Sequence, residues 1–297
     1  MKRKIAILGP SVWAIGSINF FLKKYLSKYY DVCVFDWDNS FEVKHSVSGL
    51  FDAVISTNII VGLKNMGYKI DNKSKLIGLF HNDVSDLTKN NHFDFDVSNS
   101  LDECFFYGVS NKVCKSVKER YSIECPMLPI GVCSDFWKKR NINSIKTLGI
   151  NYDVSCFNKQ NYEDVKRMSY FLDICKESKI DYSVLGGKGF MRGNEIYDSC
   201  DMLVCTSTTE ANPMGFLESA AQKIPFISTN VGIVDEFDSS MIFSSIKEAS
   251  NIIDMFRDNQ SLIKIHTDNV YDEVMDRLSW EKVIDNYWYP EIEKAIG

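Results

Sequence analysis

The sequence predicts an α/β protein made of two Rossmann-like domains, each a doubly wound parallel sheet, which face each other across a cleft. Short apolar runs alternate with amphipathic helical stretches along most of the 297 residues. Continuous apolar runs suit parallel strands that are covered on both faces. The alternation breaks around residues 126–145, where two prolines and a glycine precede polar residues, and then resumes. We therefore expect a ligand site where the carboxyl ends of the strands open into the cleft.

The first domain is predicted over residues 1–140. It opens with an apolar strand at Lys4–Leu8, and the apolar residues of Ile15–Tyr29 then recur at helical spacing. A second helix at Asn111–Tyr121 carries lysines on one side, which we interpret as a solvated helix face. The other strands of this domain are predicted at residues 31–35, 53–56, 75–80 and 105–109.

The second domain is predicted over residues 141–278. Its first strand lies within Lys146–Tyr152, and a helix follows at Tyr162–Ser178. From Ile246 onward the pattern is helical almost to the end of the chain. The other strands of this domain are predicted at residues 182–185, 202–205 and 225–228.

Composition argues against several classes of protein. The nine cysteines are an odd number and form no Cys-x-x-Cys pair, which disfavours a disulfide framework and a zinc site. Cys33 and Cys205 lie inside apolar runs, so we expect reduced, buried thiols. No apolar run approaches the roughly 20 residues that a bilayer-spanning helix needs, and no signal peptide precedes the first strand. We expect a soluble cytoplasmic protein.

Charge is distributed unevenly along the chain, whose formal net charge is −6. Residues 1–140 hold 19 basic and 15 acidic side chains, a net charge of +4, whereas residues 141–297 hold 15 and 25, a net charge of −10. The first domain could face an anionic partner, but four excess charges make a weak steering field. Ordinary surface variation is the simpler interpretation.

The segment Asp201–Phe237 carries the main functional signal. A strand ends in a run of hydroxyl residues, Glu210 follows in a turn, and Glu218 lies eight residues later on the next helix. The free N–H groups and the dipole of a helix N-terminus favour a diphosphate, while ionised glutamates accept hydrogen bonds from sugar hydroxyls. Gly215 leaves room for a close phosphate. The donor-binding residues predicted in this segment are Thr208, Pro213, Met214, Gly215, Phe216 and Glu218.

This segment resembles the C-terminal domain of the retaining glycosyltransferases of family 4, which have the fold called GT-B. In that family two glutamates separated by seven residues precede a helix of small residues, a strand led by proline and a loop containing glycine. The resemblance implies that Glu218 binds the ribose of a nucleotide and that Glu210 contacts the donor sugar as a catalytic residue. The residues that carry the resemblance are Glu210, Pro213, Glu218, Ala220, Pro225, Thr229 and Gly232.

Weaker resemblances to the same family extend over most of the chain. Leu128–Val132 is similar to the segment that enters the family's linker. Ser279–Trp280 and the helix after it are similar to the family's closing helix, which implies that residues 279–297 pack back on the first domain. His81 follows an apolar strand, and in the family a histidine in this place contacts the donor sugar, so His81 is a candidate catalytic residue.

Further candidates for contact with the donor diphosphate are less specific. Gly16 and Ser17 resemble the family's paired glycines, although a turn with a helix cap explains them equally well. The family offers an arginine and a lysine after the first strand of its C-terminal domain, and this chain lacks the arginine. Lys159 is then a candidate catalytic cation that stabilises the departing diphosphate, with Lys188 as its competitor.

The predicted reaction is retaining transfer of a sugar from a nucleotide-diphosphate sugar, UDP-linked as is commonest in the family, to an acceptor hydroxyl. No metal or other cofactor is expected, because Asp36-Trp37-Asp38, which imitates a metal motif of another fold, is interpreted as a turn. The expected acceptor is a saccharide or a lipid-linked saccharide. A hydroxymethylated base of phage DNA is the alternative acceptor. A non-catalytic sugar-nucleotide-binding module is the alternative to an enzyme, and donor hydrolysis would separate the two.

Overall fold

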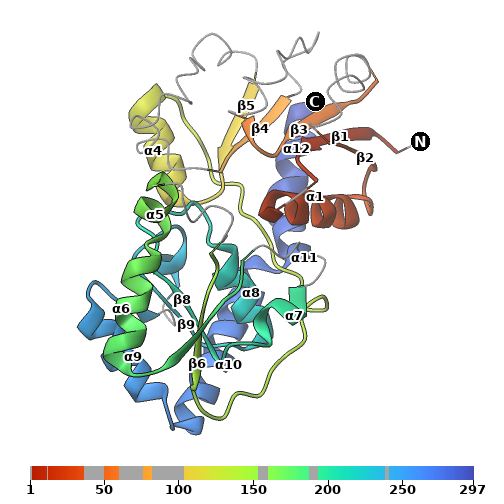
Figure 1. Cartoon of the computed structure of the whole chain (residues 1–297). Coiled ribbons are helices and arrows are strands. Elements are labelled where there is room, and N and C mark those ends of the chain that lie inside the picture. Colours follow the sequence, from red (N-terminus) through yellow and green to blue (C-terminus); the bar gives the residue numbers. More distant parts are fainter. Residues whose placement is uncertain are drawn as a thin grey trace. The chain divides into compact units, whose positions relative to one another are not determined.

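The computed structural model describes residues 2–11, 13–36, 50–59, 76–81, 104–152, 160–186, 193–237 and 241–297. The chain divides into two compact units (Figure 1). The first unit contains Met1–Gly131 together with Trp280–Gly297, and the second contains Val132–Ser279. The described strands of each unit form one parallel five-stranded sheet, with helices between strands. This confirms the predicted α/β class with two parallel-sheet domains.

The N-terminal part of the first unit contains β1 (Lys4–Gly9), α1 (Trp13–Leu26), β2 (Asp31–Asp36), β3 (Ala53–Ser56), β4 (Leu76–Phe80), β5 (Cys104–Gly108) and α4 (Asn111–Tyr121). Its strand order is β2-β1-β3-β4-β5. Every residue of β3 and β4 is buried, as expected for central strands covered on both faces. α1 ends at Leu26 instead of the predicted Tyr29, because the next residues form turns in which the Tyr29 N–H donates to the Leu26 oxygen at 2.9 Å.

Cys33 corrects one expectation from the sequence. Cys33 is exposed, although it lies in an apolar run. The reason is the position of β2 at the edge of the described sheet, where Val32 is the one fully buried residue of the strand. Cys205 is half-buried, and each cysteine in the described ranges carries a free thiol.

The C-terminal segment completes the first unit. It consists of α11 (Trp280–Val283), the π-helical turn η7 (Ile284–Trp288) and α12 (Tyr289–Ile296). The ring N–H of Trp288 donates a 3.0 Å hydrogen bond to the backbone oxygen of Pro129. The hydroxyl of Tyr107, on β5, donates to the carboxylate of Glu291. The last residues are therefore bonded to the N-terminal sheet and to the segment that follows α4.

The two places where the chain passes from one unit to the other involve neighbouring residues. The N-terminal part of the first unit ends at Gly131, whereas the sequence placed this boundary at residue 140. A Cβ atom on Gly131 would lie 2.6 Å from the indole ring of Trp280. Trp280 is 1% exposed and stacks on Phe21 with ring centroids 6.2 Å apart. Position 131 therefore has no room for a side chain.

Replacing Gly131 with alanine should lower the free energy of unfolding of the first unit by about 1–3 kcal/mol, the usual cost of overpacking a core. Urea denaturation followed by tryptophan fluorescence measures this change. The exposed Asn141, replaced with alanine, is the control and should change stability by less than about 0.5 kcal/mol. Equal stability of the Gly131 variant and the wild type would show that the Trp280 ring shifts freely to make room.

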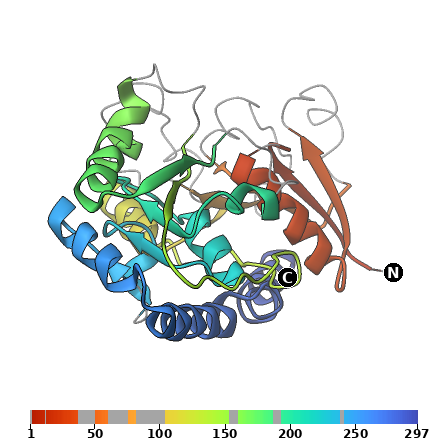
Figure 2. The ribbon, with the colours of Figure 1, turned by 60° about the horizontal axis from the view of Figure 1, so that its bottom comes forward.

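The second unit contains β6 (Thr147–Ile150), α5 (Gln160–Lys166), α6 (Met168–Ser178), β7 (Asp181–Val184), α7 (Gly193–Tyr197), β8 (Met202–Cys205), α8 (Met214–Gln222), β9 (Phe226–Ser228), η6 (Val234–Glu236), β10 (Met241–Ile242), α9 (Ile246–Phe256) and α10 (Gln260–Leu278). Its strand order is β10-β9-β8-β6-β7. α6 packs against α9, and the two helices lie side by side in Figures 1 and 2. α10 packs against α8. β8 is thus the middle strand, and its carboxyl end leads into α8.

Two elements of the second unit differ from the prediction. The helix expected over residues 162–178 is two helices, α5 and α6, because Arg167 between them has a left-handed backbone with φ of 51°. The two-residue strand β10 was not predicted, since so short a run carries no periodicity.

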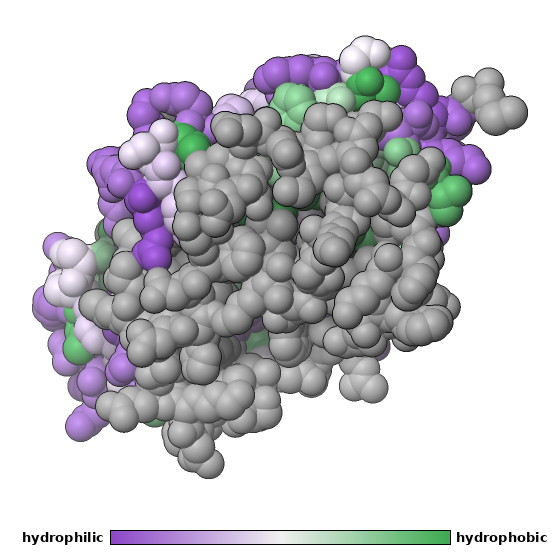
Figure 3. All heavy atoms as spheres, turned by 90° about the horizontal axis from the view of Figure 1, so that it is seen from above, coloured by the Kyte–Doolittle hydropathy of each residue, from purple (hydrophilic) through white to green (hydrophobic). Residues whose placement is uncertain are grey.

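The described surface and helices bear on membrane contact. No helix in the described ranges combines the length and hydropathy required to cross a membrane. On the face in Figure 3, most of the coloured surface is hydrophilic, and hydrophobic residues appear in small groups. The exposed large hydrophobic residues, such as Phe20, Tyr182 and Met255, come from different elements. Scattered exposure of this kind is normal for a protein surface.

Candidate functional site

The loop between β8 and α8 is held in place by the segment after β9. The Thr229 hydroxyl donates a 2.5 Å hydrogen bond to the backbone oxygen of Ser207, and the Thr229 N–H donates to that of Cys205 at 3.0 Å. Gly232 has a φ of +56°, and a Cβ atom there would lie 2.6 Å from Pro213 Cδ. The loop and the glycine segment therefore fit together without room for another side chain, which fixes the loop's position.

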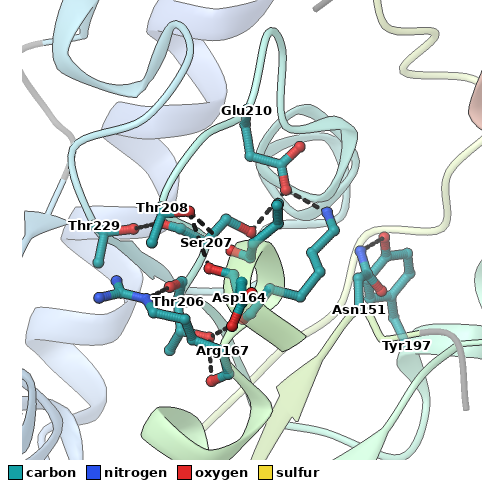
Figure 4. A network of polar contacts seen from close by, with 11 residues as sticks. Asn151, Asp164, Arg167, Tyr197, Thr206, Ser207, Thr208, Glu210 and Thr229 are labelled. Carbon is teal, nitrogen blue, oxygen red and sulfur yellow. Dashed lines mark hydrogen bonds and ion pairs between the residues drawn. The ribbon is translucent and has the colours of Figure 1, made fainter. Parts of the chain in front are cut away.

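Glu210 lies in this loop and is paired (Figure 4). Its Oε1 atom forms an ion pair with Lys166 Nζ and accepts a 2.8 Å hydrogen bond from the Ser207 hydroxyl. The side chains of Glu210 and Lys166 are 20% and 25% exposed, so water screens the pair only partly. The structure thus places a cation, Lys166, beside the predicted glutamate.

The same loop is bonded to the junction of α5 and α6. The Thr206 hydroxyl donates a 2.7 Å hydrogen bond to the Lys166 oxygen, and Arg167 Nε donates one of 2.6 Å to the Thr206 oxygen. The N–H of Thr208 donates to the Val165 oxygen at 2.8 Å (Figure 4). Thr208, a predicted donor-binding residue, is exposed and bonded to this junction through its backbone. The helix break therefore aligns Lys166 with the loop that carries Glu210.

Glu163 stabilises this helix break. Its carboxylate accepts hydrogen bonds from the Ser169 N–H at 2.8 Å, the Met168 N–H at 3.1 Å and the Tyr152 hydroxyl at 3.1 Å. Burial by itself would raise the pKa of Glu163, but these hydrogen bonds together lower the pKa below its ordinary value of 4.5. Glu163 thus satisfies the free N–H groups at the start of α6, where Arg167 provides no side-chain cap.

Replacing Glu163 with alanine should lower the free energy of unfolding by about 1–2 kcal/mol at pH 7, because two helix N–H groups lose their acceptor. The lowered pKa means that this stabilisation is present above about pH 4.5 and is lost as pH falls through the folded value. Urea unfolding at pH 7 and pH 3 measures both effects. A stability difference that is equally large at pH 3 would contradict a role for the ionised carboxylate.

Glu218 lies on the first turns of α8 and is bonded to a buried tyrosine. The hydroxyl of Tyr197 donates to its Oε2 atom, and Asn151 Nδ2 donates to the same hydroxyl at 3.2 Å. Burial raises the pKa of Glu218 to about 7, although the bond from Tyr197 lowers it in part. Glu218 therefore titrates near neutral pH, which marks it as a candidate for ligand binding.

The N-terminus of α8 agrees with the prediction only in part. No side chain caps the helix at Pro213, and among the described residues no backbone oxygen accepts from the amides of Met214 and Gly215. The Phe216 N–H, however, donates to the Pro213 oxygen at 2.8 Å, so this predicted amide is not free. Two open amides thus remain at the helix start.

Gly215 has a packing reason in addition to the predicted one. A Cβ atom at this position would lie 2.7 Å from Asn151 Nδ2 and 3.0 Å from Leu203 Cδ2. The glycine therefore allows Asn151 to approach α8, where Asn151 holds Tyr197 and so the Glu218 pair.

Three of the predicted site residues belong to the first unit: His81, Gly16 and Ser17. His81 follows β4; its Nε2 atom is buried and has no hydrogen-bond partner among the described residues. Burial lowers the pKa of His81 to about 4, so the ring is neutral at physiological pH. Gly16 is required for packing, since a Cβ atom would collide with the Ser11 oxygen. Ser17 is buried and donates to the Ala14 oxygen at 2.6 Å.

The remaining sequence candidates are only partly described. Lys159 and Lys188 lie outside the described residues. The cation that pairs with Glu210 in the described part of the chain is Lys166. Asp36 accepts a 3.1 Å hydrogen bond from the Ser11 N–H, and Asp38 lies outside the described ranges. Within those ranges, no three histidine, cysteine or acidic residues gather as a metal site would require.

Four residues near Glu210 and Glu218 were not predicted. Lys166 lay near the start of one continuous helix predicted over Tyr162–Ser178, and Asn151 and Tyr197 belong to no spaced motif. Asn212 lies in the predicted turn after Glu210 and was not among the candidate residues. The glutamate pair was recognisable because its residue types and spacing lie within one segment, whereas these partners come from separate elements.

Comparisons with known proteins identify the fold. No protein-family model and no curated protein sequence matches the chain. The crystal structure of HepE from Anabaena in complex with UDP and glucose is 12% identical, with a TM-score of 0.69 over 98% of this chain and 99% of that one. Sucrose-phosphate synthase from Thermosynechococcus elongatus is 10% identical, with a TM-score of 0.67 over 99% of this chain and 100% of that one.

A third structure, the lipopolysaccharide outer core galactosyltransferase WaaB without ligand, is 12% identical. Its TM-score is 0.57, over 97% of this chain and 99% of that chain. All three matches extend over the whole length of both proteins. This chain therefore has the two-domain α/β fold, called GT-B, of these glycosyltransferase structures.

Proposed function

We propose that this chain is a retaining glycosyltransferase that transfers a sugar from a UDP-sugar to an acceptor hydroxyl. The observation that carries the proposal is the acidic pair around the start of α8. Glu210 precedes the helix, Glu218 lies within it, and the helix start between them has open amides and no side-chain cap. The fold supports the proposal, because the HepE structures of the same fold contain UDP with glucose, or UDP-glucose.

The donor is proposed to bind at the N-terminus of α8. An ionised Glu218 only accepts hydrogen bonds, which suits the two hydroxyls of a ribose. The open amides of Met214 and Gly215, with the helix dipole, suit the diphosphate. Glu210 is proposed to accept from hydroxyls of the donor sugar. Its ion pair with Lys166 reduces the negative charge that an anionic donor meets in this loop.

The reaction requires stabilisation of the departing diphosphate more than it requires a protein nucleophile. The bond between the anomeric carbon and the diphosphate oxygen breaks, and the acceptor oxygen bonds to the same face of that carbon. The acceptor proton passes to a phosphate oxygen. Lys166 is proposed as one cation that stabilises the developing charge, with Lys159 and Lys188 as further candidates. A neutral His81 is proposed to bond a hydroxyl of the donor sugar.

The proposed acceptor is a saccharide or a lipid-linked saccharide. The test begins with thermal melting in UDP, UDP-sugars, GDP and GDP-sugars. At a ligand concentration of 100 times Kd, binding adds about 2.7 kcal/mol to stability and raises the melting temperature. Stabilisation by UDP compounds, followed by UDP release with a saccharide acceptor, supports the proposal. Binding of a UDP-sugar without UDP release in the presence of any acceptor would identify a non-catalytic module. A melting temperature that no UDP compound raises would refute the proposed UDP-sugar donor.

A further inference from the structure

The side chain of Asn212 is unusual within the loop between β8 and α8. Both of its polar atoms, Oδ1 and Nδ2, are buried, and neither has a hydrogen-bond partner in the described structure. A buried amide without partners costs free energy, because it has lost its hydrogen bonds to water and gained none. Such a group in a native protein needs an explanation, and a role in binding or catalysis is one of those known.

The backbone on both sides of Asn212 is closely packed. Ala211 and Pro213 on either side are both buried. A Cβ atom on Gly232 would meet Pro213 Cδ at 2.6 Å and the Ala211 oxygen at 3.0 Å, so the glycine segment lies directly against this stretch. Thr229 fixes the start of the loop through its bond to Ser207. The unpaired amide is therefore held on a fixed support, as a preorganised recognition group would be.

The location of Asn212 connects it with the proposed donor site. It lies two residues after Glu210 and one before Pro213, where α8 begins. A carboxamide presents one acceptor oxygen and two donor hydrogens, so its complement is a group that can both donate and accept. Two neighbouring hydroxyls on a sugar ring provide that combination, whereas the phosphates of UDP can only accept. The ribose of UDP also carries such a pair, but its hydroxyls are proposed above to bond Glu218, which leaves the donor sugar for Asn212.

We propose that Asn212 determines donor-sugar specificity by bonding a pair of vicinal hydroxyls on the sugar of the UDP-sugar. This inference rests on the proposed function, since it assigns the substrate of the same site. The donor class is then a neutral hexose that keeps both hydroxyls. Donors that lack one of them, such as deoxy sugars, should bind more weakly, because the amide would stay partly unpaired.

The test compares Asn212→Leu with the wild type. Leucine has a similar volume and no polar atoms, so the unliganded variant should be as stable as the wild type or more stable. Calorimetric titration should give UDP affinities within about threefold of each other. The affinity for a UDP-hexose such as UDP-glucose or UDP-galactose should fall about 10- to 100-fold in the variant. Asn141→Leu, at an exposed asparagine of the same unit, is the matched control and should change none of these values.

The outcomes separate this inference from the proposed function. If the wild type prefers UDP-hexoses to UDP and the variant loses that preference, the inference stands. If both proteins prefer the hexose equally, Asn212 only holds a water molecule and the inference fails while the donor class survives. If the wild type binds neither UDP nor any UDP-hexose, the proposed function fails with it. Asn212→Ser, which is small and polar, gives the same comparison if the leucine variant does not fold.

Discussion

Replacing Glu210 with glutamine should lower the rate of sugar transfer at least about 100-fold while leaving UDP affinity within about threefold. The carboxylate is proposed to contact the donor sugar, and it is the partner of Lys166. Glutamine keeps the shape but removes the charge and replaces one acceptor with a donor. Contacts with the reacting sugar then weaken, whereas contacts with the nucleotide stay. Initial rates of UDP release, together with calorimetric titration of UDP, measure the two effects separately.

Two variants make this result specific. Glu177→Gln, an exposed glutamate on α6 that pairs with Lys247, should leave the transfer rate unchanged. Lys166→Met removes the cation and leaves Glu210 intact, so it tests whether the pair acts as a unit. If it does, the double variant should be hardly slower than the slower single variant. A transfer rate within tenfold of the wild type for Glu210→Gln would remove Glu210 from the catalytic site.

Replacing Glu218 with glutamine should weaken UDP binding about 10- to 100-fold at pH 8, because the acceptor of the ribose hydroxyls loses its charge. The wild type should also show a pH dependence. Burial raises the pKa of Glu218 to about 7, and ribose hydroxyls bond best to the ionised form. Affinity for a UDP-sugar, whose esterified diphosphate does not titrate in this range, should therefore fall about tenfold for each pH unit below 7 in the wild type and stay constant in the variant. Titration calorimetry between pH 8 and pH 5.5 measures this.

The same substitution should change stability in the opposite direction. A carboxyl whose folded pKa lies above its ordinary value of 4.5 contributes its stability below that value and loses it as pH rises to about 7. The wild type should thus lose about 1–3 kcal/mol between pH 4.5 and pH 8, after allowance for the partial exposure of Glu218. Glu218→Gln lacks this loss and should be the more stable protein at pH 8. Lower stability of the variant at pH 8, measured by urea unfolding, would contradict a raised pKa.

Much of the fold could be predicted from apolar patterns. The buried strands β3 and β4 and the helix α4 lie within a residue of their predicted bounds. The pattern failed where tertiary contacts decide the local structure. Arg167 breaks the predicted helix with a left-handed backbone, which is usual for glycine and not for arginine. Bonds from Ser169 to Glu163 and from Arg167 to Thr206 stabilise the break, and neither can be read from the local pattern.

The candidate site could likewise be predicted only in part. Residue type and spacing identified Glu210 and Glu218, because both lie in one strand–loop–helix segment. The partners Lys166 and Tyr197 are distant in sequence, and nothing in their local pattern indicates a polar network. Gly215 illustrates the limit well, since the sequence suggests space for a phosphate and the structure also requires that space for Asn151.

The origin of the first unit from both ends of the chain has a consequence for biosynthesis. During synthesis, residues 1–131 are made before Trp280 and Trp288, which are at most 1% exposed in the finished first unit. The second unit is continuous in sequence and can fold earlier. The domain whose synthesis begins first is therefore completed only after the second unit has been synthesised.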